Sequence, residues 1–500
     1  MVHTAIKLRV SRAPDSEVPL KQIVLEGLGI VLLGGLTQFL SLPEQPLHSC
    51  QEDITGLLRW KMLATLCVLV VVAAAATGVE VRETAGPQLW RVAASSHHRE
   101  LRSLENEGHL DIWGGSGSHA QVMVEEEAME RVERALKEAG LEHNVEVEDV
   151  LGMVEEKTAH LRRKRSVSRQ MDWTSYHDFN DIEAFIATLN QTSAGFLRQE
   201  IAAYTEEGRP VIAVRVTDPT ATGNKKRIWI EGGIHAREWI SPAVTTFIMY
   251  QLATNPNWQP LLKLTEWYLV PVANPDGYQF SFSGDTRSRL WRKNRRSNDG
   301  RCKGVDLNRN WDLKWGVGAS GNPCSETYKG PSAFSERETL GLQSLMRQIG
   351  DIDLFITFHS FGQTVLYPWG WTVKPPANVR MLKRVAKKFG DTVKQMSKGE
   401  TNYQIGGSGP LYGLASGATD DWAYGELAVP FSYTIELPDQ GDHGFLLPES
   451  RISDTVREAA AGVYCMASYI SNYGECAARR ARNPDLGFQR QSPRFRDFRG

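Results

Sequence analysis

The chain from Tyr176 to about Tyr473 alternates apolar runs typical of buried strands with longer runs of helical periodicity. Four apolar runs predict strands: Arg227–Glu231, Glu266–Val272, Leu354–Phe358 and Phe431–Leu437. Four amphipathic runs predict helices: Val244–Ala253, Ser335–Ile349, Asn378–Met396 and Ser453–Ser471. Strands that alternate with helices form a sheet whose faces are covered. Residues 166–476 therefore predict an α/β domain with a mixed, mainly buried central sheet flanked by helices.

The apolar run Met62–Ala76 follows two basic residues and ends in small side chains. Its length of about 15 residues is short for a membrane span and typical of a signal peptide. We therefore predict a secreted, extracellular protein. The alternative is a signal anchor that holds the protein on a membrane through residues 62–76. Because a signal peptide stands at the start of a chain, residues 1–61 are interpreted as a doubtful extension ahead of a start at Met62.

Residues 77–165 predict a small α+β unit ahead of the larger domain. Its runs follow the order βαββαβ, which is the ferredoxin-like pattern. They are Gln88–Ala94, His97–Glu107, Leu110–Trp113, Val122–Val124, Glu125–Ala139 and Val145–Val147, followed by a charged helix from about Asp149. The unit ends in four consecutive basic residues, Arg162–Arg165. Such a run can be a solvated helix end, but between two units of a secreted chain it indicates proprotein cleavage after Arg165.

Composition restricts the partners and the redox chemistry of the chain. The 57 basic residues are balanced by 59 acidic ones, so no nucleic-acid partner is expected. Six cysteines, none of them in residues 77–301, exclude a disulfide-dense scaffold and favour one or two disulfides. Residues 477–500 carry seven arginines and two aspartates, a composition typical of a disordered tail. We expect a monomer.

A His-x-x-Glu pair, which can supply two ligands to a zinc ion, occurs three times: His97–Glu100, His143–Glu146 and His235–Glu238. The first two pairs lie in polar surroundings and are predicted to be surface residues. The third pair follows a predicted strand and Gly232-Gly233, and it precedes a helix start with Ser241 as the predicted cap and Pro242 in the first turn. Ligands bind at this edge of α/β sheets, so His235 and Glu238 are the candidate metal ligands.

Two more predicted strands end in ionisable residues. His359-Ser360 follows the apolar run Leu354–Phe358, and Glu436 stands near the end of Phe431–Leu437, on one face with Ser432 and Thr434. Taken alone, His359 can be a buried structural histidine, and Glu436 can be a carboxylate in a salt bridge. Together with His235 and Glu238 at one edge of a sheet, they predict a third zinc ligand and a general base.

Residues 176–475 resemble the zinc metallocarboxypeptidases of the pancreatic A/B type, and residues 88–165 are similar to the inhibitory prodomain of that family. The resemblance is carried, in the order of the family, by Gly233–Trp239, Asn274–Tyr278, Arg289–Lys293, Gly304–Trp311, His359-Ser360, Tyr412, Asp421-Trp422, Tyr433–Leu437 and Gly444–Pro448. It implies an exopeptidase that is made as a zymogen. The expected partners are peptide and protein C-termini, the chain's own prodomain and an activating proprotein convertase or trypsin-like protease.

The resemblance also implies a role for each site residue. One Zn²⁺ per chain would be held by His235, Glu238 and His359, with Glu436 as the base and Arg292 as the group that stabilises the oxyanion. The substrate's terminal carboxylate would be bound by Asn308, Arg309 and Tyr412. Other residues of the substrate cleft would be Arg237, Ser360 and Gly407. A disulfide would join Cys302 to Cys324, whereas a pairing of Cys465 with Cys476 is left open. Asn190 begins a glycosylation sequon.

Asp420 stands two positions before Trp422, where the family has the floor of its specificity pocket. A buried carboxylate there favours a cationic side chain, so we predict removal of C-terminal Lys or Arg, as in the B-type enzymes. Two departures are a loop from Tyr412 to Trp422 that is longer by one residue, and Gly370 in place of a serine. The first alternative is an A-type preference for aromatic and aliphatic residues. The second is a non-catalytic zinc- or peptide-binding module.

Overall fold

A computed structural model of the protein describes residues 8–12, 21–25, 30–33, 86–115, 117–164, 171–193, 195–298, 300 and 302–474. The chain divides into two units, Met1–Gly86 and Pro87–Gly500. In the first unit, three antiparallel strands form a sheet: β1 (Leu8–Arg12), β2 (Lys21–Leu25) and β3 (Ile30–Leu33). The predicted signal segment 62–76, the cleavage position Arg165 and the tail 477–500 lie outside the described residues. Within the described ranges, no helix is both long and apolar enough to cross a bilayer.

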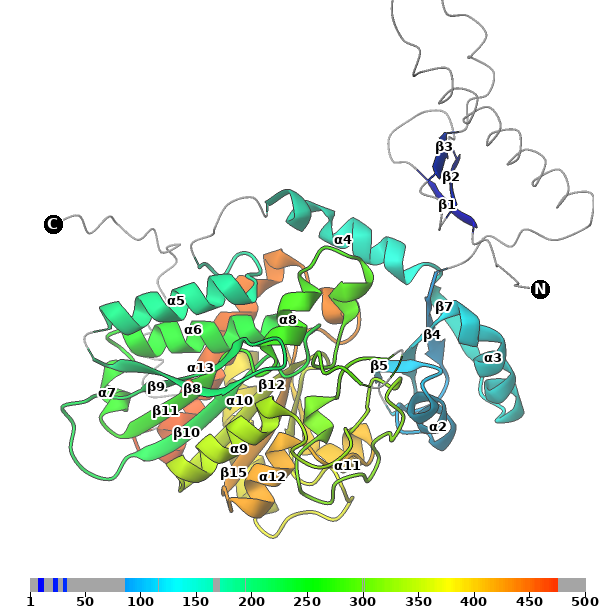
Figure 1. The fold of residues 1–500 in the computed structure, drawn as a ribbon. Helices are drawn as coiled ribbons and strands as arrows, with labels where there is room; N and C mark the ends of the chain where they lie inside the picture. The colour runs from blue at the N-terminus through cyan, green and yellow to red at the C-terminus, as the bar shows by residue number, and fades with distance from the viewer. Residues whose placement is uncertain are drawn as a thin grey trace, which may run out of the picture. The chain divides into compact units, whose positions relative to one another are not determined.

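The second unit begins with the predicted α+β unit, which has the βαββαβ order of the ferredoxin-like pattern. Its elements are β4 (Gln88–Val92), α2 (Arg99–Glu107), β5 (Asp111–Gly115), β6 (Ala120–Val124), η1 (Glu126–Ala128), α3 (Met129–Glu138), β7 (His143–Val147) and α4 (Val150–Lys164). The strands pair antiparallel in the order β5-β6-β4-β7. Leu101 and Leu104 of α2 and Val132 and Leu136 of α3 pack on one face of this sheet. Figure 1 shows α4 leading from this unit along the larger domain.

An eight-stranded mixed sheet organises the larger domain, in the order β14-β13-β15-β12-β10-β11-β9-β8. Its strands are β8 (Leu197–Tyr204), β9 (Pro210–Val216), β10 (Lys226–Glu231), β11 (Thr265–Val270), β12 (Ile352–Ser360), β13 (Thr364–Tyr367), β14 (Gln404–Gly407) and β15 (Phe431–Leu437). The four strands predicted from the sequence, β15, β12, β10 and β11, are the parallel centre of this sheet. The predicted α/β class and mixed sheet are confirmed.

Helices cover both faces of this sheet (Figure 1). One face packs against α5 (Phe179–Thr192), α6 (Ile240–Thr254), α10 (Val379–Met396) and α13 (Ile452–Ile470), and the other against α9 (Arg337–Ile349) and α12 (Thr419–Glu426). Shorter elements are α7 (Gln259–Leu262), α8 (Pro275–Ser281), η2 (Arg287–Leu290), η3 (Leu307–Arg309), α11 (Ser408–Tyr412), η4 (Gly444–Leu446) and η5 (Glu449–Arg451). Alternate residues of the central strands enter the two cores. Leu354 and Ile356 of β12 face the first core, and Phe355 faces the second.

Strands β8, β9, β13 and β14 were not predicted. The last two have only four residues each, too few for a recognisable period. Strand β8 is the sheet edge and keeps most of its side chains partly or fully exposed, so its sequence lacks an apolar run. These four strands are the outer pairs of the sheet, and their pairing includes all its antiparallel contacts.

Candidate active site

Three buried side chains converge where the central strands end. His235 and Glu238 lie in the loop between β10 and α6, and His359 is the penultimate residue of β12. The Nδ1 atom of His235 lies 2.8 Å from Oε1 of Glu238 and 3.0 Å from Nδ1 of His359. The Nδ1 atom of His359 lies 3.1 Å from Oε2 of Glu238. Two imidazole nitrogens and a carboxylate converging in this way can hold a metal ion, and this donor set is one that zinc accepts.

The loop that carries His235 and Glu238 is held by Ser241. The sequence predicted Ser241 as the cap of the following helix, but α6 already begins at Ile240 and its first residue is preceded by Trp239. The Ser241 hydroxyl instead accepts from the N–H of Gly233 at 2.9 Å and donates to the carbonyl of Glu238 at 3.0 Å. Gly233 has φ +64°, which only glycine adopts readily, and a Cβ there would lie 3.0 Å from Pro242. The hydroxyl therefore bridges the two ends of this loop.

Asp306 is a site residue that the sequence reasoning missed. Its Oδ1 lies 3.1 Å from Nε2 of His235, and its Oδ2 accepts from Nη2 of Arg292 at 2.9 Å. A carboxylate on the second nitrogen of a histidine fixes the ring so that the first nitrogen faces the metal. Asp306 precedes η3 in a loop, so no periodic pattern marked it. Its place two residues before Asn308 was the available signal.

Electrostatics favour the metal-binding protonation states of His235 and Glu238. Burial and the Arg292 guanidinium lower the pKa of His235, which favours the neutral imidazole. Burial alone would raise the pKa of Glu238, but the two histidines hold that pKa below its usual value. Burial lowers the pKa of His359, but the Glu238 carboxylate outweighs it and the net change is upward.

The register of β12 against β15 places Glu436 beside the cluster. The Cα of His359 pairs with that of Glu436, so both side chains stand on one face at the end of the parallel strands. Ser432 and Thr434 lie on this same face, as the period-two pattern predicted. Burial and the nearby Glu238 raise the pKa of Glu436 to about 8, and a base works best with a pKa near the operating pH.

A row of polar residues lies on the same face of the sheet, two residues before His359 and Glu436 along their strands. Glu231 of β10 pairs with Thr357 of β12, which pairs with Thr434 of β15. The Thr357 hydroxyl is 3.3 Å from Nε2 of His359. Glu231 is fully buried, accepts from the indole N–H of Trp229 at 3.0 Å, and has a pKa that burial raises to about 7. This row separates the site from the second apolar core.

A cavity of about 160 Å³ opens over the cluster. The lining includes Asn308, Arg309 and Tyr412 together with all three candidate ligands, Arg292, Ser360 and Glu436. The N–H of Thr419 donates to Oδ1 of Asn308 at 3.0 Å, and the Tyr412 hydroxyl is 3.1 Å from that of Thr364. Gly407 does not line this cavity; its place is taken by Ser408. The predicted site residues are thus brought together, with Gly407 as the exception.

Asp420 also lines the cavity. Asp420 is only 3% exposed, and its Oδ2 has no hydrogen-bond partner among the residues that the structure describes. Burial raises the pKa of Asp420. Its neighbour Asp421 differs, because both of its oxygens accept from the N–H of Gly370. A Cβ at Gly370 would lie 2.7 Å from the carbonyl of Ala415, so this position has no room for a serine.

The small α+β unit covers the same cavity. Ser96, Arg102, Glu105 and Asp111–Gly114 contribute to the cavity lining. Asp111 forms a buried two-point ion pair with Arg237, in which Oδ1 lies 3.1 Å from Nη2 and Oδ2 contacts Nη1. Arg102 donates to the carbonyl of Tyr412 at 2.6 Å. Arg237 was predicted to line the substrate cleft, and in this structure its guanidinium is bound by Asp111 of the small α+β unit.

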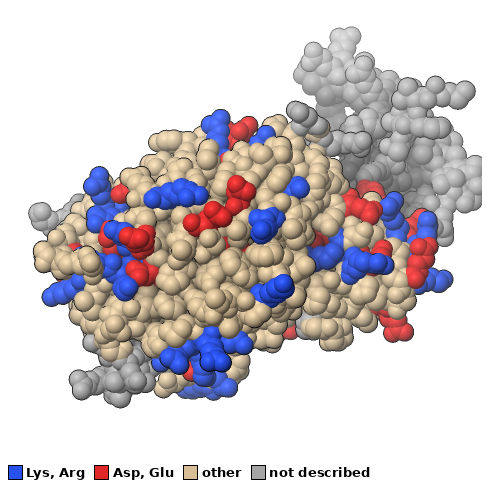
Figure 2. All heavy atoms as spheres, turned by 90° about the horizontal axis from the view of Figure 1, so that it is seen from below, with Lys and Arg blue, Asp and Glu red and all other residues tan. Residues whose placement is uncertain are grey.

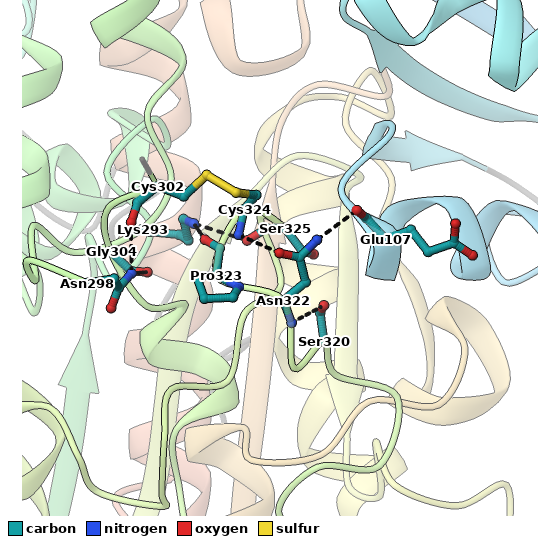
Figure 3. The surroundings of a disulfide bond; sticks show 10 residues. All are labelled: Glu107, Lys293, Asn298, Cys302, Gly304, Ser320, Asn322, Pro323, Cys324 and Ser325. Atoms are coloured by element: carbon teal, nitrogen blue, oxygen red, sulfur yellow. Dashed lines mark hydrogen bonds between the residues drawn. A yellow bond between two sulfur atoms is a disulfide. The ribbon is translucent and has the colours of Figure 1, made fainter. Parts of the chain in front are cut away.

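The predicted disulfide joins Cys302 to Cys324, close to where the larger domain contacts the small α+β unit (Figure 3). Lys293, adjacent to Arg292, donates to the carbonyl of Pro323 at 2.7 Å. Asn322 donates to the carbonyl of Glu107 in α2 at 2.7 Å. The closed loop therefore fastens the Arg292 segment on one side and meets the small unit on the other. Cys476 lies outside the described residues, and its pairing with Cys465 stays open.

Comparisons with known proteins agree with this arrangement. A family model described as zinc carboxypeptidase matches residues 182–462, and one described as carboxypeptidase activation peptide matches residues 90–157. Carboxypeptidase B of Astacus astacus is 39% identical over 308 residues, covering 60% of this chain and 99% of that protein. Carboxypeptidase A1 of Bos taurus is 32% identical over 423 residues, covering 81% and 99%. The crystal structure of carboxypeptidase A from Helicoverpa armigera superposes with a TM-score of 0.70 at 28% identity, covering 78% and 98%.

The chain belongs to the zinc carboxypeptidase family. It is a zinc-dependent metallocarboxypeptidase that carries its own activation peptide, and it is therefore a zymogen that acts on peptides once the inhibitory prodomain is released. The donor set of His235, Glu238 and His359 fits the zinc ion of this family. Relatives of both A and B type match, so the family alone leaves the preferred C-terminal residue open.

Proposed function

We propose that the mature enzyme removes C-terminal Lys and Arg from peptides and proteins, with zinc held by His235, Glu238 and His359. The observation that carries the basic preference is Asp420, a buried carboxylate with an unpartnered oxygen that lines the same cavity as the metal cluster. A buried negative charge stabilises a cationic side chain and disfavours an apolar one. The alternative is an A-type preference for aromatic or aliphatic residues, and the Bos taurus relative named carboxypeptidase A1 is the observation in its favour.

In the proposed mechanism, the bound zinc supplies Lewis acidity, which lowers the pKa of a water molecule and polarises a carbonyl. Glu436 accepts the proton of the attacking water on its carboxylate and transfers it to the leaving amine. Glu436 therefore acts first as a base and then as an acid, because the same group takes the proton and gives it up. Arg292 stabilises the negative charge that develops on the scissile carbonyl oxygen, and Asp306 fixes its guanidinium in place.

Exopeptidase action follows from the other end of the cavity. Asn308, Arg309 and Tyr412 lie where they can hold the substrate's terminal carboxylate, since all three line the cavity beside the metal cluster. A guanidinium offers two parallel N–H donors to the two oxygens of a carboxylate. A peptide bond within a chain presents no such carboxylate, so the site selects chain ends.

The proposal is tested with paired peptides that end in Arg or Phe and are otherwise identical. After cleavage at Arg165, the protein is expected to release Arg in preference to Phe, and a zinc chelator should abolish both activities until zinc is restored. Amino acid release is measured by chromatography. Chelator-sensitive release of Phe over Arg would support the A-type alternative, and release that survives complete zinc removal would contradict the metal site.

We further propose that Asp111 locks the zymogen by occupying Arg237. Both side chains are buried, with 5% and 1% of each residue exposed, so breaking the pair leaves a charge without its partner. An Asp111→Asn variant of the uncleaved protein should gain activity toward a short peptide ending in Arg by about 30-fold or more. Initial rates before and after cleavage measure this gain.

The matched control for this lock is Glu125→Gln. Glu125 of the small α+β unit pairs with Arg287 of the larger domain at 2.9 Å, but both side chains are substantially exposed. Exposed ion pairs contribute little to the stability of a contact, so this variant should keep the low activity of the zymogen. Equal activity of the two variants would show that the Asp111 contact carries no special inhibition.

We also propose that the protein is secreted and activated by cleavage after Arg165. Support comes from the apolar run Met62–Ala76 and the basic run Arg162–Arg165 in the sequence. Asn190 is exposed at the end of α5, where glycosylation is accessible. Expression from Met1 and from Met62 in secreting cells, followed by N-terminal sequencing, tests the proposal. Material in the medium should begin near residue 77, whereas membrane-bound material that begins at residue 1 would favour the anchor.

A further inference from the structure

The outer face of α10 carries a continuous array of cations. Its inner face, formed by Leu382, Val385, Ala386, Phe389 and Val393, packs into the first core of the larger domain. At 100° per residue, the basic residues all fall on the opposite face; they are Arg380, Lys383, Arg384, Lys387, Lys388 and Lys394. With 1.5 Å of rise per residue, the array extends over about 21 Å from its first member to its last.

Few acidic residues neutralise the positive charge of this array. Asp391 is the only acidic residue of α10, and it pairs with Lys387 at 2.7 Å. Lys388 lies over the Tyr469 ring at 5.1 Å. Within the described part of the chain, no ion pair is found for Arg380, Lys383, Arg384 or Lys394. Figure 2 shows Lys and Arg side chains gathered at the lower edge of the larger unit with little red among them, while the two charges mix over the rest of that face.

This arrangement works against the helix itself. Arg380 and Arg384, Lys383 and Lys387, and Arg384 and Lys388 are each four residues apart, so like charges lie side by side along the helix. Like charges at this spacing destabilise a helix, and opposite charges stabilise it. A bound polyanion would reverse the sign of this contribution, because each negative group would lie between neighbouring cations.

We propose that this face of α10 binds a linear sulfated polysaccharide. The cations form a straight row on one helix, and a linear chain of negative groups can contact several of them at once. Among the described residues of α10, Met381 is the one exposed large apolar side chain, 38% exposed, and this is too little apolar surface to anchor the helix in a lipid layer. An extracellular polyanion is the relevant class because secretion is proposed above, and this inference rests on that proposal.

The location of α10 makes such binding compatible with catalysis. Helix α10 packs on the first core, whereas Thr357, His359 and Glu436 stand on the other face of the sheet. A polysaccharide on α10 would therefore hold the enzyme in place and leave the cavity over the metal cluster accessible. The enzyme could then act on chain ends while retained at a sulfated matrix.

The experiment measures equilibrium binding of the full-length protein to immobilised heparin at physiological salt. The variant Lys383→Gln/Arg384→Gln/Lys394→Gln removes three unpaired cations from α10 and keeps good helix formers. Each cation near an anionic surface contributes about fivefold in affinity, so the variant should bind heparin roughly 100-fold more weakly at physiological salt. Activity of the cleaved variant on a peptide ending in Arg should be unchanged.

The matched control is Arg198→Gln/Lys263→Gln/Arg337→Gln, which removes the same total charge from exposed positions on other elements. An equal loss of heparin affinity in this control would show a general charge effect and overturn the proposal. A chain that ends at Tyr473 tests the Arg-rich tail, and complete loss of binding there would move the site away from α10. Tighter binding to duplex DNA or to phosphatidylserine vesicles than to heparin would overturn the choice of a sulfated polysaccharide.

Discussion

A Glu436→Gln variant of the cleaved enzyme is expected to lose kcat/KM on a peptide ending in Arg by about 10²- to 10⁴-fold. The amide has nearly the shape of the carboxylate but cannot accept the proton from water. Because Glu436 is not one of the candidate ligands, zinc should remain bound at one ion per chain. Steady-state kinetics measure the first effect, and metal analysis of the purified protein measures the second.

Glu338→Gln is the control for this loss. Glu338 is a buried carboxyl of α9 whose pKa is raised by burial to about 8, much like that of Glu436. It hydrogen-bonds with Asn294 and does not line the cavity. This variant should keep its catalytic constants, even if its thermal stability changes. Full activity of Glu436→Gln, or loss of its zinc, would contradict the role assigned to the base.

An Asp420→Ala variant should lose about 10²- to 10³-fold in kcat/KM for a peptide ending in Arg, because the guanidinium would then be buried without its partner. For a peptide ending in Phe, kcat/KM should be unchanged or higher, since the apolar ring no longer meets a buried carboxylate. The ratio of the two constants is the quantity to measure, because it is insensitive to the amount of active enzyme.

Asp421→Asn separates this effect from a general disturbance of α12. Both oxygens of Asp421 are already hydrogen-bonded to the backbone of Gly370, so its replacement should lower the melting temperature without reversing the preference. A variant at Asp420 that keeps the Arg-to-Phe ratio of the unmodified enzyme would exclude this residue as the specificity determinant.

Most strands with long apolar runs were predictable, and so were the residues at their ends, although the apolar run of β9 was missed. The strands β10 and β12 are buried on both faces and carry continuous apolar runs, whereas β15 alternates polar residues with apolar ones. A histidine or glutamate at the end of such a strand is conspicuous, so His359 and Glu436 could be proposed as site residues from the sequence. The small unit was also predictable, because its helices are amphipathic and its strands alternate.

The parts that escaped prediction depend on contacts between distant segments. Asp306 acts through His235, which lies 71 residues away in the sequence, and Asp111 meets Arg237 across 126 residues. Neither pairing leaves a periodic signal. Ser241 looked like a helix cap because it precedes a proline, but its hydroxyl is used by Gly233 and Glu238. Gly407 was assigned to the pocket wall by position alone, and the neighbouring Ser408 lines the cavity instead.

The pairing of His359 with Glu436 across two parallel strands has a consequence for how this enzyme can change over time. Side chains alternate between the faces of a strand, so one residue inserted within β15 ahead of Glu436 would turn it into the apolar core opposite the metal cluster. An insertion between Tyr412 and Trp422 leaves both strands unaltered. Related enzymes can therefore differ in the length of the pocket loop, and so in substrate preference, whereas the lengths of β12 and β15 must be kept.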